Sequence, residues 1–288
     1  MLEKSTVGLF FLLLIWGSVV TGLEAGLACP DWPKCHGEYI PPLRWDIYVE
    51  FSHRVLGGVA GLLLIILAYK RFKVYDQAYR AIPIIAVVLL AIQVVMGGLV
   101  VLLKLPMNLT TLHFSTALII FSLVLFLAYF NDSRKPDFSN NTFTLFFFLS
   151  LLVLSQGALG AYVRHSGAGL ACPDFPKCLG FWIPPELSGI VLTHFLHRTL
   201  AYIIFAVFIF LLIYSRTTDT LQKYRKKIAI VFGLIIFQIL LGVGIIHTKL
   251  YFAVTATHVF VALLILYILL NTWYSENTKH SENAGSTV

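Results

Sequence analysis

The chain has little charge: only 12% of its 288 residues are Asp, Glu, Lys or Arg, whereas 58% are hydrophobic. A soluble domain carries roughly 25% charged residues to cover its surface. With about half that share and a mean hydropathy of +0.84, the chain lacks the polar surface that water requires. This excludes a cytosolic enzyme, a nucleic-acid-binding protein and a disordered scaffold. It predicts an all-α integral membrane protein surrounded by lipid.

No small-residue cleavage site follows the first apolar run convincingly, although the run otherwise resembles a signal peptide. Because further apolar runs follow, we expect this one to be retained as a membrane helix. Crossing a bilayer takes about 20 residues, and eight runs are long enough. We expect spans near 7–23, 47–69, 81–103, 109–130, 142–163, 189–214, 227–246 and 251–273.

Basic residues are distributed unevenly between the segments that join these runs. The segments on the side of both termini hold 13 Lys and Arg residues, and those on the other side hold six. Cytoplasmic segments of membrane proteins are enriched in basic residues. We therefore expect a multi-pass protein of the cell membrane, with both termini in the cytoplasm and the two long loops outside. The net charge of +7 needs no nucleic-acid partner to explain it.

The sequence contains an internal repeat. Residues 25–37 return as residues 168–180 with 11 identical positions, at an offset of 143. Further matches join 40–42 with 183–185, 53–54 with 197–198, 93 and 97 with 238 and 242, and 113 with 258. Such a match indicates a duplicated unit. With four spans in each unit the halves run parallel, so we expect two tandem four-helix bundles, residues 1–135 and 136–288.

Cysteine is scarce, and all four cysteines lie in the long outer loops as two C-x5-C pairs. An oxidising compartment favours the disulfides Cys29–Cys35 and Cys172–Cys178. The spacing does not match the C-x-x-C-H of covalently attached haem, and zinc would need further ligands nearby. An alternative is that one pair, the first, is redox-active and relays electrons. The spacing does not decide between the two.

Five of the nine histidines lie at the outer ends of the spans: His53, His113, His194, His197 and His258. Ionisable residues in spans are costly and usually functional. Each half supplies one such histidine on its second span and one on its fourth, His53 with His113 and His197 with His258. Two imidazoles that face each other across a four-helix bundle can hold a haem iron. No carboxylate or thiolate accompanies them in the second half, which disfavours zinc or a di-iron centre.

Other residues near these histidines have two interpretations. Arg54 and Arg198 each follow a histidine near the outer surface, where a guanidinium could pair with a haem propionate or extend to lipid headgroups. Gly57 and Gly61 follow His53 on one helical face, where they could admit a flat macrocycle or simply pack helices.

The two halves differ one turn before the first histidine. Glu50 precedes His53 by three residues, on the same helical face, and the corresponding residue of the second half is His194. A carboxylate beside a haem can move protons or stabilise a developing positive charge. This predicts a reactive haem site in the first half and an electron-storing haem site in the second. The alternative is that Glu50 only pairs with Arg54.

In combination, these motifs resemble the heme A synthase family. They are E-F-S-H-R at 50–54, H-F-S-T at 113–116, H-x-x-H-R at 194–198, T-H-V at 257–259 and the paired cysteine loops. The resemblance extends from the first span to the eighth. It implies an oxidoreductase that converts the C8 methyl of haem O to the formyl of haem A by successive hydroxylations, for haem-copper terminal oxidases.

The resemblance also implies roles for individual residues. His53 and His113 would bind the substrate, haem O, and His197 and His258 would bind a permanent haem b. Glu50 would be the acidic residue near the reaction centre, and the cysteine pairs fit a bacterial subgroup. Expected partners are a haem O synthase and an electron donor that the sequence does not identify; assembly into a homo-oligomer remains open.

Three other classes of protein are rivals. A di-haem b-type membrane cytochrome would pass electrons without modifying haem and would have no use for Glu50. A transporter built from parallel repeats would use the histidines as a proton relay. A thiol oxidoreductase would depend on the cysteine loops and not on the membrane histidines.

Overall fold

The structure is a computed structural model that describes residues 1–131, 134–136 and 144–280. Within this part of the chain, eight helices have the length and hydropathy to cross a membrane. They are α1 (Leu2–Gly22), α2 (Trp45–Val74), α3 (Ala81–Leu102), α4 (Met107–Tyr129), α5 (Thr144–His165), α6 (Gly189–Tyr214), α8 (Arg225–His247) and α9 (Phe252–Glu276). The eight predicted spans are confirmed, except that residues 142–143 of the fifth lie outside the described residues.

Some helices extend beyond the expected apolar runs. Helix α2 continues through its basic end to Val74, since Arg71 is buried there. Its guanidinium donates to the Leu127 carbonyl and to Glu3, both at 2.7 Å. Helix α1 begins at Leu2, before the expected apolar run, and the ion pair between Glu3 and Arg71 stabilises this first turn. Hydrogen bonds of this kind allow charged residues to extend a span past its apolar run.

The remaining elements are short. They are three 3-10 turns (η1 Ala25–Leu27, η2 Gln77–Tyr79 and η3 Ala168–Leu170), helix α7 (Asp219–Gln222) and strands β1 (Arg134–Pro136) and β2 (Thr278–His280). The two strands pair antiparallel, which was not predicted. Pro136 lacks a backbone N–H and favours an extended segment over a helix at this point.

The eight helices form two bundles. In the first bundle α1 packs on α2, α2 on α3, α3 on α4 and α4 on α1; in the second, α5, α6, α8 and α9 close an equivalent ring. The bundles meet through α1 against α9, α4 against α5, and α4 against α9. The first two of these contacts exchange under the repeat, as expected for halves related by an axis along the membrane normal.

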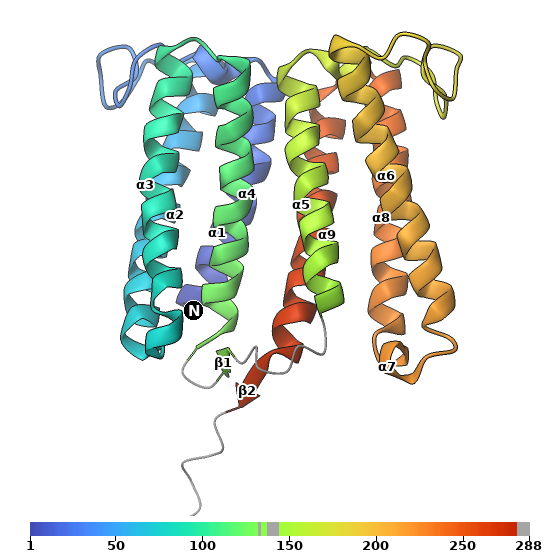
Figure 1. Ribbon diagram of the computed structural model, residues 1–288. Coiled ribbons are helices and arrows are strands. Elements are labelled where there is room, and N and C mark those ends of the chain that lie inside the picture. The colour runs from blue at the N-terminus through green and yellow to red at the C-terminus, as the bar shows by residue number, and fades with distance from the viewer. Residues whose placement is uncertain (132–133, 137–143, 281–288) are drawn as a thin grey trace, which may run out of the picture.

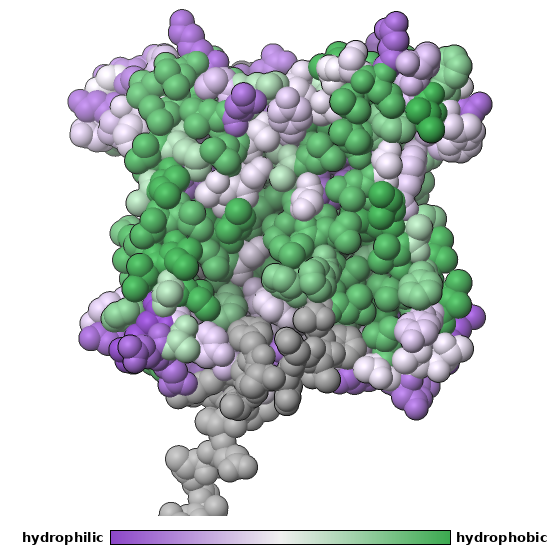
Figure 2. Space-filling model, in the orientation of Figure 1, coloured by the Kyte–Doolittle hydropathy of each residue, from purple (hydrophilic) through white to green (hydrophobic). Residues whose placement is uncertain are grey.

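Both long loops lie at the same end of the molecule, opposite the N-terminus and the β1–β2 ladder (Figure 1). A hydrophobic belt covers the middle of the visible face, and hydrophilic residues gather at both ends (Figure 2). This distribution matches a protein that spans a membrane several times.

The buried apolar cores lie away from the long loops. In the first bundle the core gathers the later half of α2 and α4, including Leu64 and Phe121, and in the second it includes Phe208 and Ile265. The four paired histidines lie nearer the loop ends of the same helices. Each bundle is thus packed tightly at one end and carries its polar residues at the other.

Candidate haem sites

Each of the four paired histidines lies against a glycine of the preceding helix. A Cβ added at Gly17 of α1 would lie 3.1 Å from Cε1 of His53, and one added at Gly160 of α5 would lie 3.1 Å from Cε1 of His197. Gly97 of α3 contacts His113 in the same way at 3.1 Å, whereas Gly242 of α8 leaves 3.7 Å to His258. Gly17, Gly97 and Gly160 let the imidazole rings lie against the neighbouring helix backbone, because a Cβ there would force each ring to shift, whereas a Cβ at Gly242 would make an ordinary contact with His258.

Every one of these rings has a buried nitrogen without a partner. Within the described chain, Nδ1 of His53, His113, His197 and His258 is buried and makes no hydrogen bond. Burying a polar atom without a partner is unfavourable, and an imidazole nitrogen with a free lone pair is a metal ligand. The rings of His53 and His113 are close enough to interact electrostatically, and so are those of His197 and His258.

Glutamine side chains lie beside two of the rings. The amide nitrogen Nε2 of Gln93 donates to the His113 carbonyl at 3.0 Å and lies 3.4 Å from the ring Nε2. Gln156 makes the same two contacts with His197, at 3.0 and 3.4 Å. Both amides hold the backbone and the ring of a histidine to the adjacent helix.

The second bundle and its border with the first enclose a cavity of about 280 Å³. Its lining includes both histidines of the pair, His197 and His258, with their glycines Gly160 and Gly242. His194, Arg198 and the glutamines Gln156 and Gln238 also line it, and most of the remaining lining is apolar. An apolar cavity with a few convergent polar groups is the usual form of a cofactor site.

These features fit a haem. The site offers paired imidazoles, unpartnered ring nitrogens, glycines that keep the rings close to the backbone, and apolar walls. The described residues contain no group of three or more His, Cys, Asp or Glu side chains that could hold a metal ion by themselves. Two imidazoles complete the coordination of an iron only when a macrocycle supplies the other ligands.

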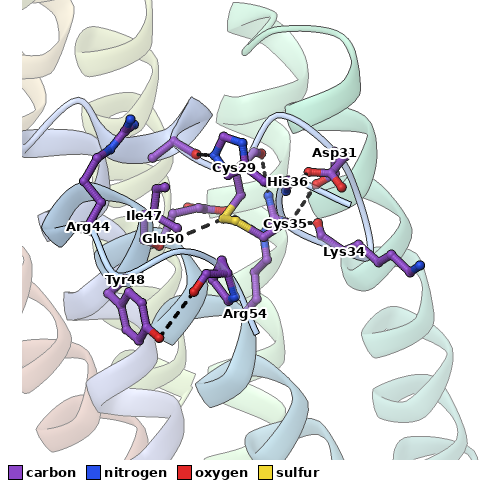
Figure 3. The surroundings of a disulfide bond; sticks show 12 residues. Cys29, Asp31, Lys34, Cys35, His36, Arg44, Ile47, Tyr48, Glu50 and Arg54 are labelled. Carbon is purple, nitrogen blue, oxygen red and sulfur yellow. Dashed lines mark hydrogen bonds and ion pairs between the residues drawn. A yellow bond between two sulfur atoms is a disulfide. The ribbon is translucent and has the colours of Figure 1, made fainter. Parts of the chain in front are cut away.

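Both predicted disulfides are confirmed: Cys29 is bonded to Cys35, and Cys172 to Cys178. Arg54 reaches from α2 to the loop that the first disulfide closes (Figure 3). It donates to the backbone carbonyls of Cys29, Asp31 and Lys34 at 2.8–2.9 Å. The guanidinium therefore fastens the loop to the helix that carries His53.

Arg198 fastens the second loop in the same manner, by donating to the carbonyls of Cys172, Asp174 and Lys177. Most N–H groups of Arg54 and Arg198 are hydrogen-bonded to carbonyls of the two loops. The prediction that these arginines bind haem propionates stays a prediction. Of the glycines expected to flank the macrocycle, Gly57 faces open space and Gly61 lies near Leu90.

The residue one turn before each arginine differs between the halves. Glu50 is buried at 6% exposure, and its Oε1 accepts a hydrogen bond from Nε of Arg54 at 2.9 Å. His194 is equally buried, and its Nε2 lies 3.2 Å from Nε of Arg198. Its Nδ1 lies 3.4 Å from the Cys172 backbone nitrogen. The equivalent arginines thus contact different groups: Arg54 contacts a carboxylate, and Arg198 contacts an imidazole.

A pair of aspartates shapes the two loops outside the membrane. Asp31 accepts hydrogen bonds from the backbone N–H groups of His36 and Gly37, at 2.6 and 2.8 Å. Asp174 accepts them from Leu179 and Gly180 at 2.7 and 2.8 Å. These backbone N–H donors hold the pKa of each carboxyl below its usual value, and the largest contributions come from Gly37 and Gly180.

The structure brings together the two histidines of each half, His53 with His113 and His197 with His258, and it sets Glu50 beside Arg54. Sequence reasoning missed Gly17, Gly160 and Gln156, which lie on helices without a predicted ligand. One signal was present: Gly17 and Gly160 are separated by 143 residues, the same offset that relates the cysteine loops.

Comparison with known proteins identifies the family of this chain. A family model described as "Cytochrome oxidase assembly protein" (COX15-CtaA) matches residues 4–270. Proteins named heme A synthase from Halalkalibacterium halodurans and Shouchella clausii are 31% and 30% identical to this chain. The matches cover 91% and 93% of this chain and 90% and 93% of theirs. A third, from Alkalihalophilus pseudofirmus, is 31% identical over 83% of this chain and 84% of its own. With a family match over nearly its whole length, the chain belongs to the COX15-CtaA family of cytochrome oxidase assembly proteins.

Proposed function

We propose that this protein is a heme A synthase, an oxidoreductase that converts the C8 methyl of haem O to the formyl group of haem A by successive hydroxylations. The observation that carries the proposal is a duplicated histidine–glycine frame in which only one copy has a carboxylate. The names of relatives that align over about nine-tenths of the chain support it. The product would serve the assembly of haem-copper terminal oxidases.

The two halves would divide the work. Residues 1–135 would bind haem O between His53 and His113, and residues 136–288 would bind haem b between His197 and His258. Haem b, when bound, supplies a one-electron carrier. The glycines against the rings set where each imidazole lies, and the apolar walls of the cavity exclude water from the second site.

Glu50 would act at the reacting methyl. Arg54 engages its Oε1, and among the described residues no hydrogen bond is made to Oε2. This oxygen can accept a proton or stabilise positive charge that develops at the substrate carbon. Arg54 holds the carboxylate in place, since its other N–H groups are fixed on the loop carbonyls.

The protein would lie in the cell membrane with its termini in the cytoplasm and its cysteine loops outside. Haem O, a lipid-soluble substrate, would arrive from a haem O synthase, and a separate donor would supply electrons. The substrate half and the haem b half are in contact through α1, α4, α5 and α9, so electrons need cross only one protein interface.

The test is extraction and chromatography of haem from protein that is purified after expression with a haem O supply. We expect haem B, haem O and haem A or its alcohol precursor from the unaltered protein. Glu50→Gln should keep haem O bound but reduce formyl formation about 100-fold or more. Glu38→Gln, in an exposed part of the first loop, is the control and should behave as wild type.

Two results would contradict the proposal. Haem A production by Glu50→Gln at the wild-type rate would remove the role of the carboxylate. Two haem B molecules per chain, with no haem O or haem A under either supply, would instead identify a cytochrome that only passes electrons.

A further inference from the structure

We propose that Arg164 binds a propionate carboxylate of the haem in the second bundle. This inference rests on the haem b site proposed between His197 and His258. It assigns an anionic partner to a half-buried guanidinium that lines the cavity and that, among the described residues, makes one hydrogen bond and no ion pair.

The described residues that line the cavity carry positive charge and no negative charge. Two arginines, Arg164 and Arg198, belong to this lining, and no Asp or Glu does. A guanidinium stays protonated at physiological pH, and its charge is costly within a membrane protein unless a polar or anionic partner compensates it. The cavity therefore favours a ligand with carboxylate groups, and a haem carries two propionates.

The two arginines differ in what occupies their N–H groups. Arg198 donates through Nε, Nη1 and Nη2 to His194 and to carbonyls of the second loop. Among the described residues Arg164 donates only through Nη2, to the Thr21 carbonyl of α1 at 3.0 Å. The exposed Glu24 interacts with Arg164 electrostatically, but the two form no ion pair in the described part of the chain. Most N–H groups of Arg164 are thus available to an anion in the cavity.

The position of Arg164 on α5 suits this role. Gly160, four residues earlier, lies against the ring of His197. Residues four apart share one face of a helix and are separated by about 6 Å along its axis. Arg164 therefore lies on the same face of α5 as Gly160, in the last turn, nearer the end of the molecule that carries the long loops (Figure 1). Both propionates of a haem extend from one edge, and Arg164 would bind that edge if it is turned toward the loops.

The first bundle has no guanidinium at this place. The repeat offset of 143 residues relates Arg164 to Thr21, whose hydroxyl donates to the Gly17 carbonyl at 3.1 Å. A hydrogen bond between charged groups is about twice as strong as one between neutral groups. At this position only the second site thus offers a charged partner for a propionate, which adds to its retention of haem b.

The experiment uses protein purified after expression without a haem O supply, so that haem b is the haem present. Transfer of haem to excess apomyoglobin measures retention, and the propionate bending band of the resonance Raman spectrum reports hydrogen bonds to the propionates. In Arg164→Gln we expect haem b to leave about 10-fold faster, because a hydrogen bond between charged groups is lost. The propionate band should shift in the same variant. Arg44→Gln, at an exposed arginine of the first loop, is the control and should keep both wild-type values.

Arg164→Lys keeps the positive charge but lacks the planar set of donors. We expect this variant to shift the propionate band while it retains haem b to within about 3-fold of wild type, because the ammonium still attracts the carboxylate. It also tests the inference if Arg164→Gln does not fold, since an unchanged band in Arg164→Lys would overturn it.

An unchanged propionate band in Arg164→Gln would overturn the inference whatever the rate of haem loss, since Arg164 would then only join α5 to α1. An unchanged rate of loss would overturn it as well. Neither result affects the proposed function, which depends on haem O and haem A. If wild-type protein held haem b but made no haem A under a haem O supply, the proposed function would fail and the test of Arg164 would stand. Purification without any haem would contradict both.

Discussion

The two bundles share a frame and differ in what surrounds it. In both, a disulfide loop is fastened by an arginine on the second helix, and a histidine next to that arginine lies against a glycine. They differ at Glu50 against His194 and at Thr21 against Arg164. The residues that hold the loops and the rings are therefore the same in both halves. The residues one helical turn away from them differ.

The largest effect is expected when this difference is erased. Glu50→His gives the first bundle the imidazole of the second and removes the carboxylate, so formyl formation should fall about 100-fold or more. The measurement is haem A per protein, by extraction and chromatography. The reciprocal change, His194→Glu, should leave haem b bound and formyl formation near wild type; a comparable loss there would show that the two positions are not functionally distinct.

The glycines test the frame itself. Gly160→Ala adds a methyl 3.1 Å from Cε1 of His197, and Gly17→Ala does the same at His53. Each ring must then shift, so each variant should lose about 10-fold in affinity for the haem of its own site only. Gly8→Ala, which meets nothing within 4 Å on the same helix as Gly17, is the matched control. Loss of both haems in either variant would contradict two independent sites.

Arginine variants test the similarity of the loops. Arg54→Met and Arg198→Met remove charge-assisted hydrogen bonds to three loop carbonyls, and each should lower the free energy of unfolding by about 3 kcal/mol. Thermal unfolding in detergent measures this. Arg44→Met, which breaks only an exposed ion pair with Asp46, should change little. A variant of Arg198 that unfolds like wild type would show that its loop is held by other contacts.

The smallest effect concerns pH. The pKa values of Asp31 and Asp174 are lowered by backbone N–H donors, so each carboxylate stabilises its loop above the ordinary Asp pKa of about 3.9. This stabilisation is lost as the pH falls through the lowered value. Hydrogen exchange at Gly37 and Gly180, corrected for its intrinsic rate, should therefore show less protection at the acidic end. Asp31→Asn should weaken protection of Gly37 only; an equal loss at Gly180 would contradict this assignment.

Much of the fold follows from the sequence. Eight apolar runs predict eight helices because lipid requires internally hydrogen-bonded spans, and the cysteines pair as their spacing and predicted outer location indicate. The ends of α2 could not be predicted from hydropathy, since its basic turn continues as helix through bonds of Arg71 to Leu127 and Glu3. Those partners are distant in sequence and meet only in the packed bundle.

The candidate site was predictable where residues are costly in a membrane and less so where they are ordinary. Histidines and Glu50 stand out because burying them requires a reason. Gly17 and Gly160 resemble the many glycines that pack membrane helices, and only their distance to a ring identifies them. The sequence left Arg54 two interpretations, a propionate partner or a residue that extends to lipid headgroups, and it cannot reveal that three loop carbonyls lie within reach of this side chain.

The most direct test of the account is the haem content of single histidine variants, expressed with a haem O supply. We expect His197→Ala and His258→Ala to lose haem B, and His53→Ala and His113→Ala to keep haem B while losing haem O and haem A. If all four variants lose the same haem to the same extent, the two bundles do not hold separate sites and the central claim is wrong.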